Sequence, residues 1–430
     1  MKKILFYSLS ILLFSAKAQY NGKLGYAYSP NNFPDNSTGT DIGNFYNDVV
    51  SSLPCGSTVM WNGLWYDYKQ TIGQVPMAAV VNANASPVPY NYEEINAFTF
   101  FHFPNIVWLN SISQPAPNNF TNQSVRDSFL FMLKTHAIQH QPANVFIGNE
   151  VSFYLSMDSV DYTNFKSFYN MAYDTIKFYS PQTKVGTIFN YEHLSGKGSL
   201  TGWNTPHWNA LTDLDTARLD MVGITLYPFF NYQHASQVPK NYLNPLITKI
   251  GNKKIRITET GWPADSTFSI AQWACSPNEQ ITFHQRLFDS IIPGKNIRSV
   301  NWLFLNYLMS HANDGYKIFR SVAMRDSLGN DRPVKTAWES RCMATYINET
   351  ERTDDISVYP NPAKDVLHVQ LFANNKQHQL QLYDITGQLV KTITGSTDNI
   401  FIDIKDLAKG MYILHYKNDT SSFSKKIIIQ

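Results

Sequence analysis

The sequence predicts an α/β protein in which a (β/α)₈ TIM barrel is followed by a small all-β sandwich domain. Between Lys23 and about Trp338, short β-rich runs alternate with helical patterns. Several runs are almost continuously apolar, as in DMVGITLYPFF at 220–230, which is typical of parallel strands covered on both faces. Near residue 350 the pattern changes to short alternating strands with no helical segment between them.

Eight strands that alternate with helices favour a closed barrel over a doubly wound sheet. No Gly-rich phosphate loop follows the first strand, which weakens a nucleotide-binding fold further. The candidate strands are Lys23–Tyr28, Ser57–Trp61, Met77–Asn82, Asn144–Asn149, Lys184–Phe189, Met221–Tyr227, Lys254–Thr258 and Arg298–Leu305, with Asn105–Asn110 as a ninth. One of the early runs must therefore be a loop or a helix.

Two segments between these strands have the spacing of amphipathic helices. Their apolar stripes are Phe129, Met132, Leu133 and Ala137, and Phe165, Phe168, Tyr169, Ala172 and Ile176. We expect both stripes to pack in the core, because apolar side chains at i, i+3 and i+4 form one face of a helix.

The N-terminus has the pattern of an export signal. Lys2 and Lys3 precede an apolar run, 4–14, and a small-x-small site at 16–18, so we expect residues 1–18 to be a signal peptide. The apolar run is too short to span a bilayer, and no other candidate span occurs. We place the barrel at 19–345, a polar linker at 346–355 and the sandwich at 356–430.

Composition excludes some classes of partner. The formal net charge is only +2, which gives no reason to expect nucleic acid or an anionic membrane surface. Aromatic residues make up 14% of the chain; they fill cores, but exposed rings also stack on sugars. The three cysteines, Cys55, Cys275 and Cys342, allow at most one internal disulfide and lie too far apart for a zinc knuckle.

Two glutamates stand at the ends of buried runs. Glu150 ends NVFIGNE and Glu259 ends RITE, and by strand count they follow strands four and seven. In a (β/α)₈ barrel the C-terminal ends of the strands surround the active site. Two carboxyls that flank a bond suit glycoside hydrolysis, in which one donates a proton while the other attacks the anomeric carbon.

These segments resemble the clan A glycoside hydrolases, which carry Asn-Glu after strand four and a nucleophilic Glu after strand seven. IGNEV, ITETGWP and GITLYPFF look most like family 17, the β-1,3-glucanase type, with family 53, the β-1,4-galactanases, as a second likeness. The resemblance implies an acid/base role for Glu150 and a nucleophilic role for Glu259. It further implies substrate-binding roles, which fall on Asn149 (the sugar 2-hydroxyl), Tyr227 (orienting Glu259), Trp302 (a platform under the sugar), and Trp262 and Tyr28 (lining the site).

The resemblance implies a secreted retaining β-glycosidase that acts on a polysaccharide of the β-glucan or galactan type. The alternative is a catalytically inactive barrel that binds glycan at the cell surface, since fold does not guarantee chemistry. NWLFLNYL lacks the acidic residue that often follows the last strand in family 17. Glu192 and His193 end strand five and either bind substrate or simply lie in a loop.

The sequence lacks the motifs of metal-dependent enzymes and of serine hydrolases. No HExxH or similar spacing gathers the histidines, so we expect no metal site and no cofactor. No GxSxG motif is present, so a serine hydrolase would lack its nucleophile.

The tail resembles the C-terminal sorting domain of type IX secretion cargo in Bacteroidota. The matching segments are VYPNPA, LYDITGQLV, LAKGMYIL and the final KKIII. The resemblance implies the type IX secretion machinery as a partner and a secreted or outer-surface location. A carbohydrate-binding module is the other interpretation, but the tail has no Trp.

Overall fold

The structure is a computed structural model in which the chain forms two compact units, residues 1–344 and 345–430. The described residues are 20–33, 36–53, 55–65, 92–102, 106–107, 119–265, 274–308, 317–343, 356–371, 378–384, 388–397, 399–418 and 422–430.

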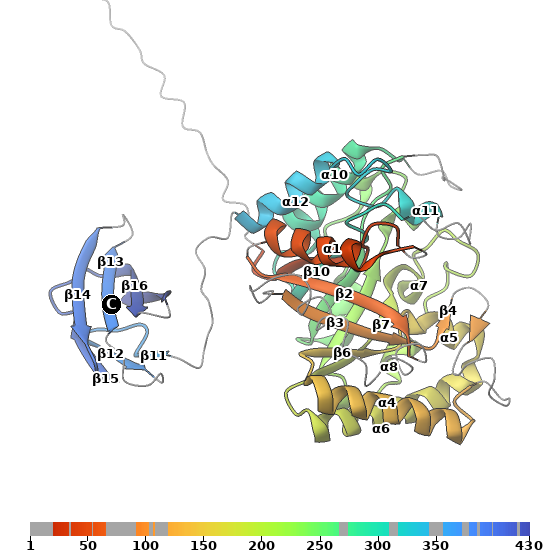
Figure 1. Cartoon of the computed structure of the whole chain (residues 1–430), viewed down its shortest axis with the longest axis horizontal. Coiled ribbons are helices and arrows are strands. Elements are labelled where there is room, and N and C mark those ends of the chain that lie inside the picture. Colours follow the sequence, from red (N-terminus) through yellow and green to blue (C-terminus); the bar gives the residue numbers. More distant parts are fainter. Residues whose placement is uncertain are drawn as a thin grey trace, which may run out of the picture. The chain divides into compact units, whose positions relative to one another are not determined.

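The first unit is a closed barrel of eight parallel strands, as predicted (Figure 1). Its order is β1-β10-β9-β8-β7-β6-β3-β2, with β1 pairing to both β2 and β10 to close the cylinder. The strands are β1 (Lys23–Ala27), β2 (Ser57–Leu64), β3 (Tyr92–Thr99), β6 (Asn144–Ile147), β7 (Lys184–Asn190), β8 (Met221–Leu226), β9 (Lys254–Thr260) and β10 (Ile297–Trp302).

The third barrel strand differs from the sequence-based expectation. It is β3, in the segment YEEINAFT, which pairs with β2 and β6. The candidate Asn105–Asn110 was wrong as a barrel strand: its described residues, Ile106–Val107, form β5, which pairs with β4 (Phe101–His102) in a separate sheet. The candidate Met77–Asn82 lies outside the described residues. Two glutamates at the start of β3 broke the apolar pattern on which the prediction relied.

Helices surround the strands, and their ends have clear sequence signals. Thr38 and Asp41 form a capping box before α1, and Pro277 stands in the first turn of α10, where its missing N–H costs nothing. The helices are α1 (Gly39–Ser52), α4 (Gln123–His140), α5 (Val151–Met157), α6 (Ser159–Tyr179), α7 (Tyr191–Ser195), α8 (Asn209–Thr212), α9 (Asn244–Ile250), α10 (Pro277–Arg286), α11 (Lys317–Arg320) and α12 (Pro333–Met343). There are also the 3₁₀ turns η1 (Thr216–Arg218), η2 (Pro228–Phe230) and η3 (Ala235–Gln237), and a π-helical segment, η4 (Leu287–Ile291), that follows α10.

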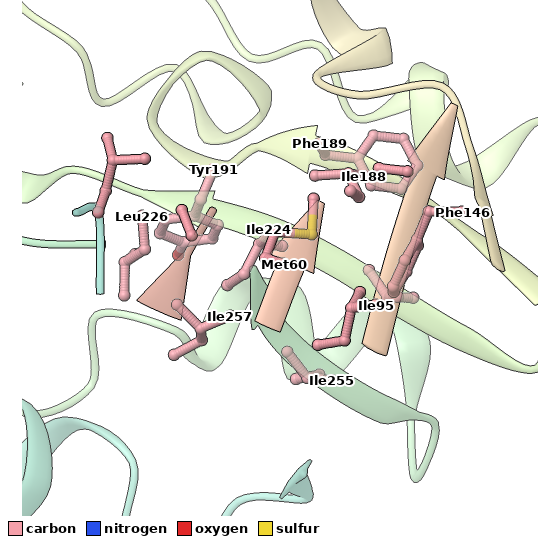
Figure 2. Close-up of a cluster of buried hydrophobic side chains, with 14 of the residues drawn as sticks. Met60, Ile95, Phe146, Ile188, Phe189, Tyr191, Ile224, Leu226, Ile255 and Ile257 are labelled. Carbon is pink, nitrogen blue, oxygen red and sulfur yellow. The ribbon is translucent and has the colours of Figure 1, made fainter. Parts of the chain in front are cut away.

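The two predicted apolar stripes are confirmed as buried faces of α4 and α6. These helices lie side by side on the barrel (Figure 1), and all nine stripe residues are buried. Within the barrel, a Cβ on Gly186 would come 3.1 Å from the Phe146 ring, and a Cβ on Gly223 would come 2.9 Å from it. Figure 2 shows Phe146 in the same apolar cluster as Ile95, Met60 and Ile188. Apolar side chains therefore pack closely around Phe146 inside the barrel.

One disulfide closes the barrel unit. Cys55, in the loop that leads into β2, is bonded to Cys342 near the end of α12, 287 residues later. The sequence allowed one bridge without indicating which pair forms it.

The second unit consists of two antiparallel sheets, as predicted. One has the order β11-β12-β15 and the other β14-β13-β16-β17. Leu367, Val369 and Leu371 are buried at alternating positions of β12, as their spacing predicted. The strands are β11 (Ile356–Tyr359), β12 (Val366–Leu371), β13 (His378–Asp384), β14 (Leu389–Gly395), β15 (Asn399–Asp403), β16 (Gly410–Asn418) and β17 (Ser422–Ile429).

Candidate active site

Glu150 and Glu259 stand where the sequence placed them, at the C-terminal ends of strands four and seven. Glu150 comes three residues after β6 ends, and Glu259 is the penultimate residue of β9. Both side chains are partly exposed. Because all eight strands are parallel, both carboxyls belong to the same end of the barrel.

The backbone turns sharply between β6 and Glu150. Gly148 has φ +86°, and a Cβ there would come within 2.5 Å of Val151 and 2.8 Å of the Phe100 ring. Glu150 itself has φ 54° and ψ 39°, the left-handed region that non-glycine residues rarely occupy. Glu150 directly precedes α5 but makes no capping bond with its side chain, so its carboxyl is available for other contacts.

The Glu150 carboxyl is bound on one side only. Its Oε1 accepts hydrogen bonds from Nδ2 of Asn190, at 3.0 Å, and from Oγ1 of Thr225, at 2.6 Å. Among the described residues, Oε2 has no hydrogen-bond partner. Burial raises the pKa of Glu150, and the two hydrogen bonds oppose that shift in part.

The Glu259 carboxyl is bound on both sides. Its Oε2 accepts from the Tyr227 hydroxyl at 2.7 Å, and its Oε1 from Nδ2 of Asn149 at 3.5 Å. Burial, and next the negative charge of Glu150, raise the pKa of Glu259, while the two donors lower it. The two carboxyls therefore interact electrostatically, because the charge of Glu150 disfavours the ionisation of Glu259.

Tyr227 connects strand six to this pair. It directly follows β8 and its side chain is buried, so burial and the charges of Glu259 and Glu150 raise the pKa of its phenol well above the usual value. A neutral phenol can only donate to a carboxylate at physiological pH. Tyr227 thus makes the contact with Glu259 that the resemblance implied.

Sequence reasoning left Glu192 and His193 open, and the structure buries both in the short helix α7. Glu192 accepts from the Tyr227 backbone N–H and from the Tyr242 hydroxyl, each at 2.9 Å. His193 stacks on His207 with ring centroids 4.2 Å apart, and its Nε2 lies 3.2 Å from the Ser156 hydroxyl. Neither residue is in an open loop. Adjacency to strand five was the only sequence signal for Glu192.

The three other predicted aromatic residues have different surroundings. Trp302, the last residue of β10, is fully buried; it lies against Phe283 and Trp338 of the outer helices and donates from Nε1 to the Val322 carbonyl at 2.8 Å. Trp262 is also fully buried and donates to the Ala274 carbonyl. Neither indole has a ring face open to solvent in this structure.

Tyr28, directly after β1, is half-buried and lies edge-on to Phe33 and Phe45. Contacts of Trp302, Trp262 and Tyr28 with a sugar stay predictions. Within the described residues, no group of three or more His, Cys, Asp or Glu side chains gathers as a metal site. No helix in the same residues is long and apolar enough to cross a membrane.

Two families match parts of the chain. Residues 116–284 match Glycosyl hydrolase family 53, and residues 357–430 match the Secretion system C-terminal sorting domain. The first match contains both glutamates and Tyr227. No curated protein matches the chain in sequence.

Solved structures share the barrel at low sequence identity. A GH5_18 protein from Streptomyces cattleya in complex with Manβ1-4GlcNAc is 12% identical, with a TM-score of 0.55 over 80% of this chain and 84% of that one. An exo-β-1,4-mannosidase from an Opitutaceae bacterium is 11% identical, with a TM-score of 0.52 over 76% and 59%. The β-glucuronidase 2 of Bacteroides uniformis is 9% identical, with a TM-score of 0.51 over 95% of this chain.

The chain spans only 46% of the length of that glucuronidase, and identities this low show the fold alone. The family matches add the class of the barrel and the nature of the tail. The chain therefore joins an eight-stranded barrel, in which residues 116–284 match a glycosyl hydrolase family, to a tail that matches a secretion-system sorting domain.

Proposed function

We propose that the barrel is a retaining β-glycosidase that hydrolyses a β-linked polysaccharide of the galactan or β-glucan type. The strongest support is the distribution of hydrogen-bond donors over the two carboxyls. Donors to both oxygens of Glu259 favour its ionised form, whereas both donors to Glu150 reach Oε1 and leave Oε2 for a proton. A double displacement needs this division between a charged nucleophile and a protonated acid.

The reaction would proceed in two steps. In the first, a Glu259 oxygen bonds to the anomeric carbon while the glycosidic C–O bond breaks, and the Glu150 proton passes to the leaving oxygen. In the second, a water gives its proton to Glu150 and its oxygen bonds to the anomeric carbon, which releases Glu259. Each glutamate thereby returns to its initial protonation state.

Asn149 supports the proposal from the substrate side. Its Nδ2 donates to Glu259, but its Oδ1 is buried and has no hydrogen-bond partner among the described residues. Buried polar atoms are rarely left unpaired, and a hydroxyl of the bound sugar would supply the missing donor. We assign this contact to the sugar 2-hydroxyl, next to the reacting carbon.

The substrate proposal follows the family match. Family 53 covers the segment with both glutamates, so β-1,4-galactan is the first polymer to test. The test measures reducing-sugar release by the purified full chain on β-1,4-galactan, β-1,3-glucan, mixed-linkage glucan and β-mannan. We expect activity on one polymer to fall by roughly a thousandfold or more in Glu259→Gln and in Glu150→Gln, with the fold intact by circular dichroism.

Two results would contradict the proposal. Full activity in either variant would remove that glutamate from the mechanism. No release from any of the four polymers, together with retardation of the protein in a gel that contains one of them, would favour the inactive glycan-binding barrel.

We further propose that residues 1–18 act as an export signal, and that the tail engages the type IX secretion machinery. The match of residues 357–430 to a sorting domain supports the second part. Deletion of 356–430 should keep the protein inside the cell envelope, as measured by immunoblots of culture medium, cell surface and periplasm in a host with this pathway. Unchanged release of the truncated protein would refute a sorting role.

A further inference from the structure

Glu192 is a fully buried carboxyl that the proposed reaction uses neither as acid nor as nucleophile. It lies on α7, directly after β7, and both of its oxygens accept hydrogen bonds. Oε2 binds the Tyr227 backbone N–H, and Oε1 binds the Tyr242 hydroxyl, each at 2.9 Å. A carboxyl in this setting is costly to bury, so its contacts need an explanation.

The Tyr227 backbone needs an acceptor at this position. β8 ends at Leu226, and the residue after Tyr227 is Pro228, which has no N–H. At φ −129° and ψ 70°, Tyr227 belongs neither to the strand nor to the 3₁₀ turn that follows. Its N–H would lack a partner in regular secondary structure, and Glu192 supplies one from the neighbouring strand end.

The fixed backbone determines where the Tyr227 hydroxyl points. The ring is packed against Phe229 and Phe319, and its hydroxyl donates to Glu259 at 2.7 Å. A contact therefore runs from Glu192 after strand five, through Tyr227 after strand six, to Glu259 at the end of strand seven.

We propose that Glu192 is a positioning residue: by accepting the Tyr227 N–H, it holds the Tyr227 hydroxyl against Glu259 in the orientation that the reaction needs. The inference rests on the proposed function of Glu259. It assigns a role in the site to a residue whose side chain is fully buried.

The alternative is that Glu192 affects the site only through the negative charge of its carboxylate. Burial raises the pKa of Glu192 to about 7, opposed by its two donors and reinforced by the charge of Glu150. The titratable groups that face it are Tyr227, Tyr242, Tyr191, Tyr232 and Glu150. A test must therefore separate the loss of an acceptor from the loss of a charge.

The variants Glu192→Met and Glu192→Gln make this separation. Both remove the charge at similar volume, but only Gln keeps an oxygen that can accept the Tyr227 N–H. We expect kcat of Glu192→Met to lie roughly 10- to 100-fold below that of Glu192→Gln, because a displaced reacting group costs this much, while KM changes little. In a Tyr227→Phe background the difference between Met and Gln should disappear, because the hydroxyl that Glu192 positions is absent.

Equal kcat for Met and Gln would overturn the inference, as would a difference that persists in the Tyr227→Phe background. If Glu192→Met does not fold, Tyr242→Phe replaces it, since it frees the other oxygen of Glu192. We expect a smaller loss of kcat for Tyr242→Phe, and no such loss when Tyr242→Phe is made in the Tyr227→Phe background. The same loss in that background would contradict the positioning role of Glu192.

A second measurement does not depend on hydrolysis. The titration of Glu259 can be followed by ¹³C NMR of glutamate side-chain carboxyls, assigned with Glu259→Gln. The Tyr227 hydroxyl lowers the pKa of Glu259, so its displacement should give Glu259 a higher pKa in Glu192→Met than in Glu192→Gln. Identical titrations would refute the positioning role even on an active enzyme, whereas inactivity of the unmodified chain would refute only the proposed function.

Discussion

Glu93 at one end of the barrel and the pair Glu150 and Glu259 at the other are partly buried carboxyls that have opposite kinds of partner. At the N-terminal end, Glu93 of β3 forms ion pairs with Arg256 of β9 and Lys23 of β1, and Nδ2 of Asn144 donates to it as well. At the C-terminal end, the donors to Glu150 and Glu259 are neutral amides and hydroxyls. No cation contacts either glutamate within the described residues.

These partners shift the pKa in opposite directions. Burial alone would raise the pKa of Glu93, but Arg256 and then Lys23 outweigh it and lower the pKa. Neutral donors are too weak to do the same for Glu150 and Glu259, whose pKa values stay raised. A cation beside a carboxyl locks its charge and ties strands together, whereas a neutral donor orients the carboxyl and leaves its proton exchangeable.

The largest expected effect concerns the disulfide at the N-terminal end. Replacing Cys55 and Cys342 by Ser opens a 287-residue loop, and we expect the free energy of unfolding to fall by about 2–5 kcal/mol. Urea denaturation measures this loss, with Cys275→Ser, outside the bridge, as the matched control. Hydrolysis per folded molecule should stay unchanged; a large loss of kcat in the double variant would mean that the two ends are not independent.

Removal of the Arg256 guanidinium, which forms an ion pair with Glu93, has the next largest expected effect. Arg256→Met leaves Glu93 with Lys23 and Asn144 only, and we expect unfolding free energy to drop by about 2–4 kcal/mol. The double variant Arg256→Met/Glu93→Leu should recover part of that loss, because no charge is then left without its partner. If the double variant is less stable than Arg256→Met alone, Glu93 stabilises the fold by more than its ion pair with Arg256.

The smallest effect is a difference in pH dependence between the ends. Glu259 has a raised pKa when folded, so its contribution to stability is present below its unfolded pKa and is lost as pH rises through the folded value. Glu259→Gln should therefore match the wild type near pH 4 and exceed it by about 1–3 kcal/mol near pH 8.

Glu93→Gln should behave in the opposite way. The folded pKa of Glu93 is lowered, so its contribution is present above the unfolded pKa and is lost as pH falls through the folded one. Gln at this position should cost stability near pH 8 and little at low pH. Chemical denaturation between about pH 4 and pH 8 measures the free energy of unfolding of both variants. If that free energy changed with pH in the same way in Glu259→Gln and Glu93→Gln, the distinction between the two ends would be lost.

Much of this arrangement could be predicted because local sequence determines it. The apolar runs before Glu150 and Glu259 indicated strands, and a parallel barrel then brings the residues after those strands to one end. The surroundings of the tryptophans could not be predicted in this way. Trp302 ends a strand, but whether its ring is open to solvent or packed on Trp338 depends on α12, a later segment of the chain.

The remaining misses share a cause, which is partners distant in sequence. Glu93 and Glu94 gave β3 a polar start that reads as a loop, and only Arg256, 163 residues later, explains Glu93 in a strand. The role of Glu192 depends in the same way on Tyr227 and Tyr242. No pattern of spacing within one segment records such contacts.

The left-handed backbone of Glu150 has a consequence for how this chain could evolve. Its φ of 54° strains any side chain with a Cβ, and the carboxyl is also desolvated with only neutral donors beside it. Glycine at this position would relieve all of these costs, so random drift that is filtered by foldability alone should erode the glutamate. On the proposed mechanism, continued selection for proton transfer is what would maintain a residue that the fold itself would be better without.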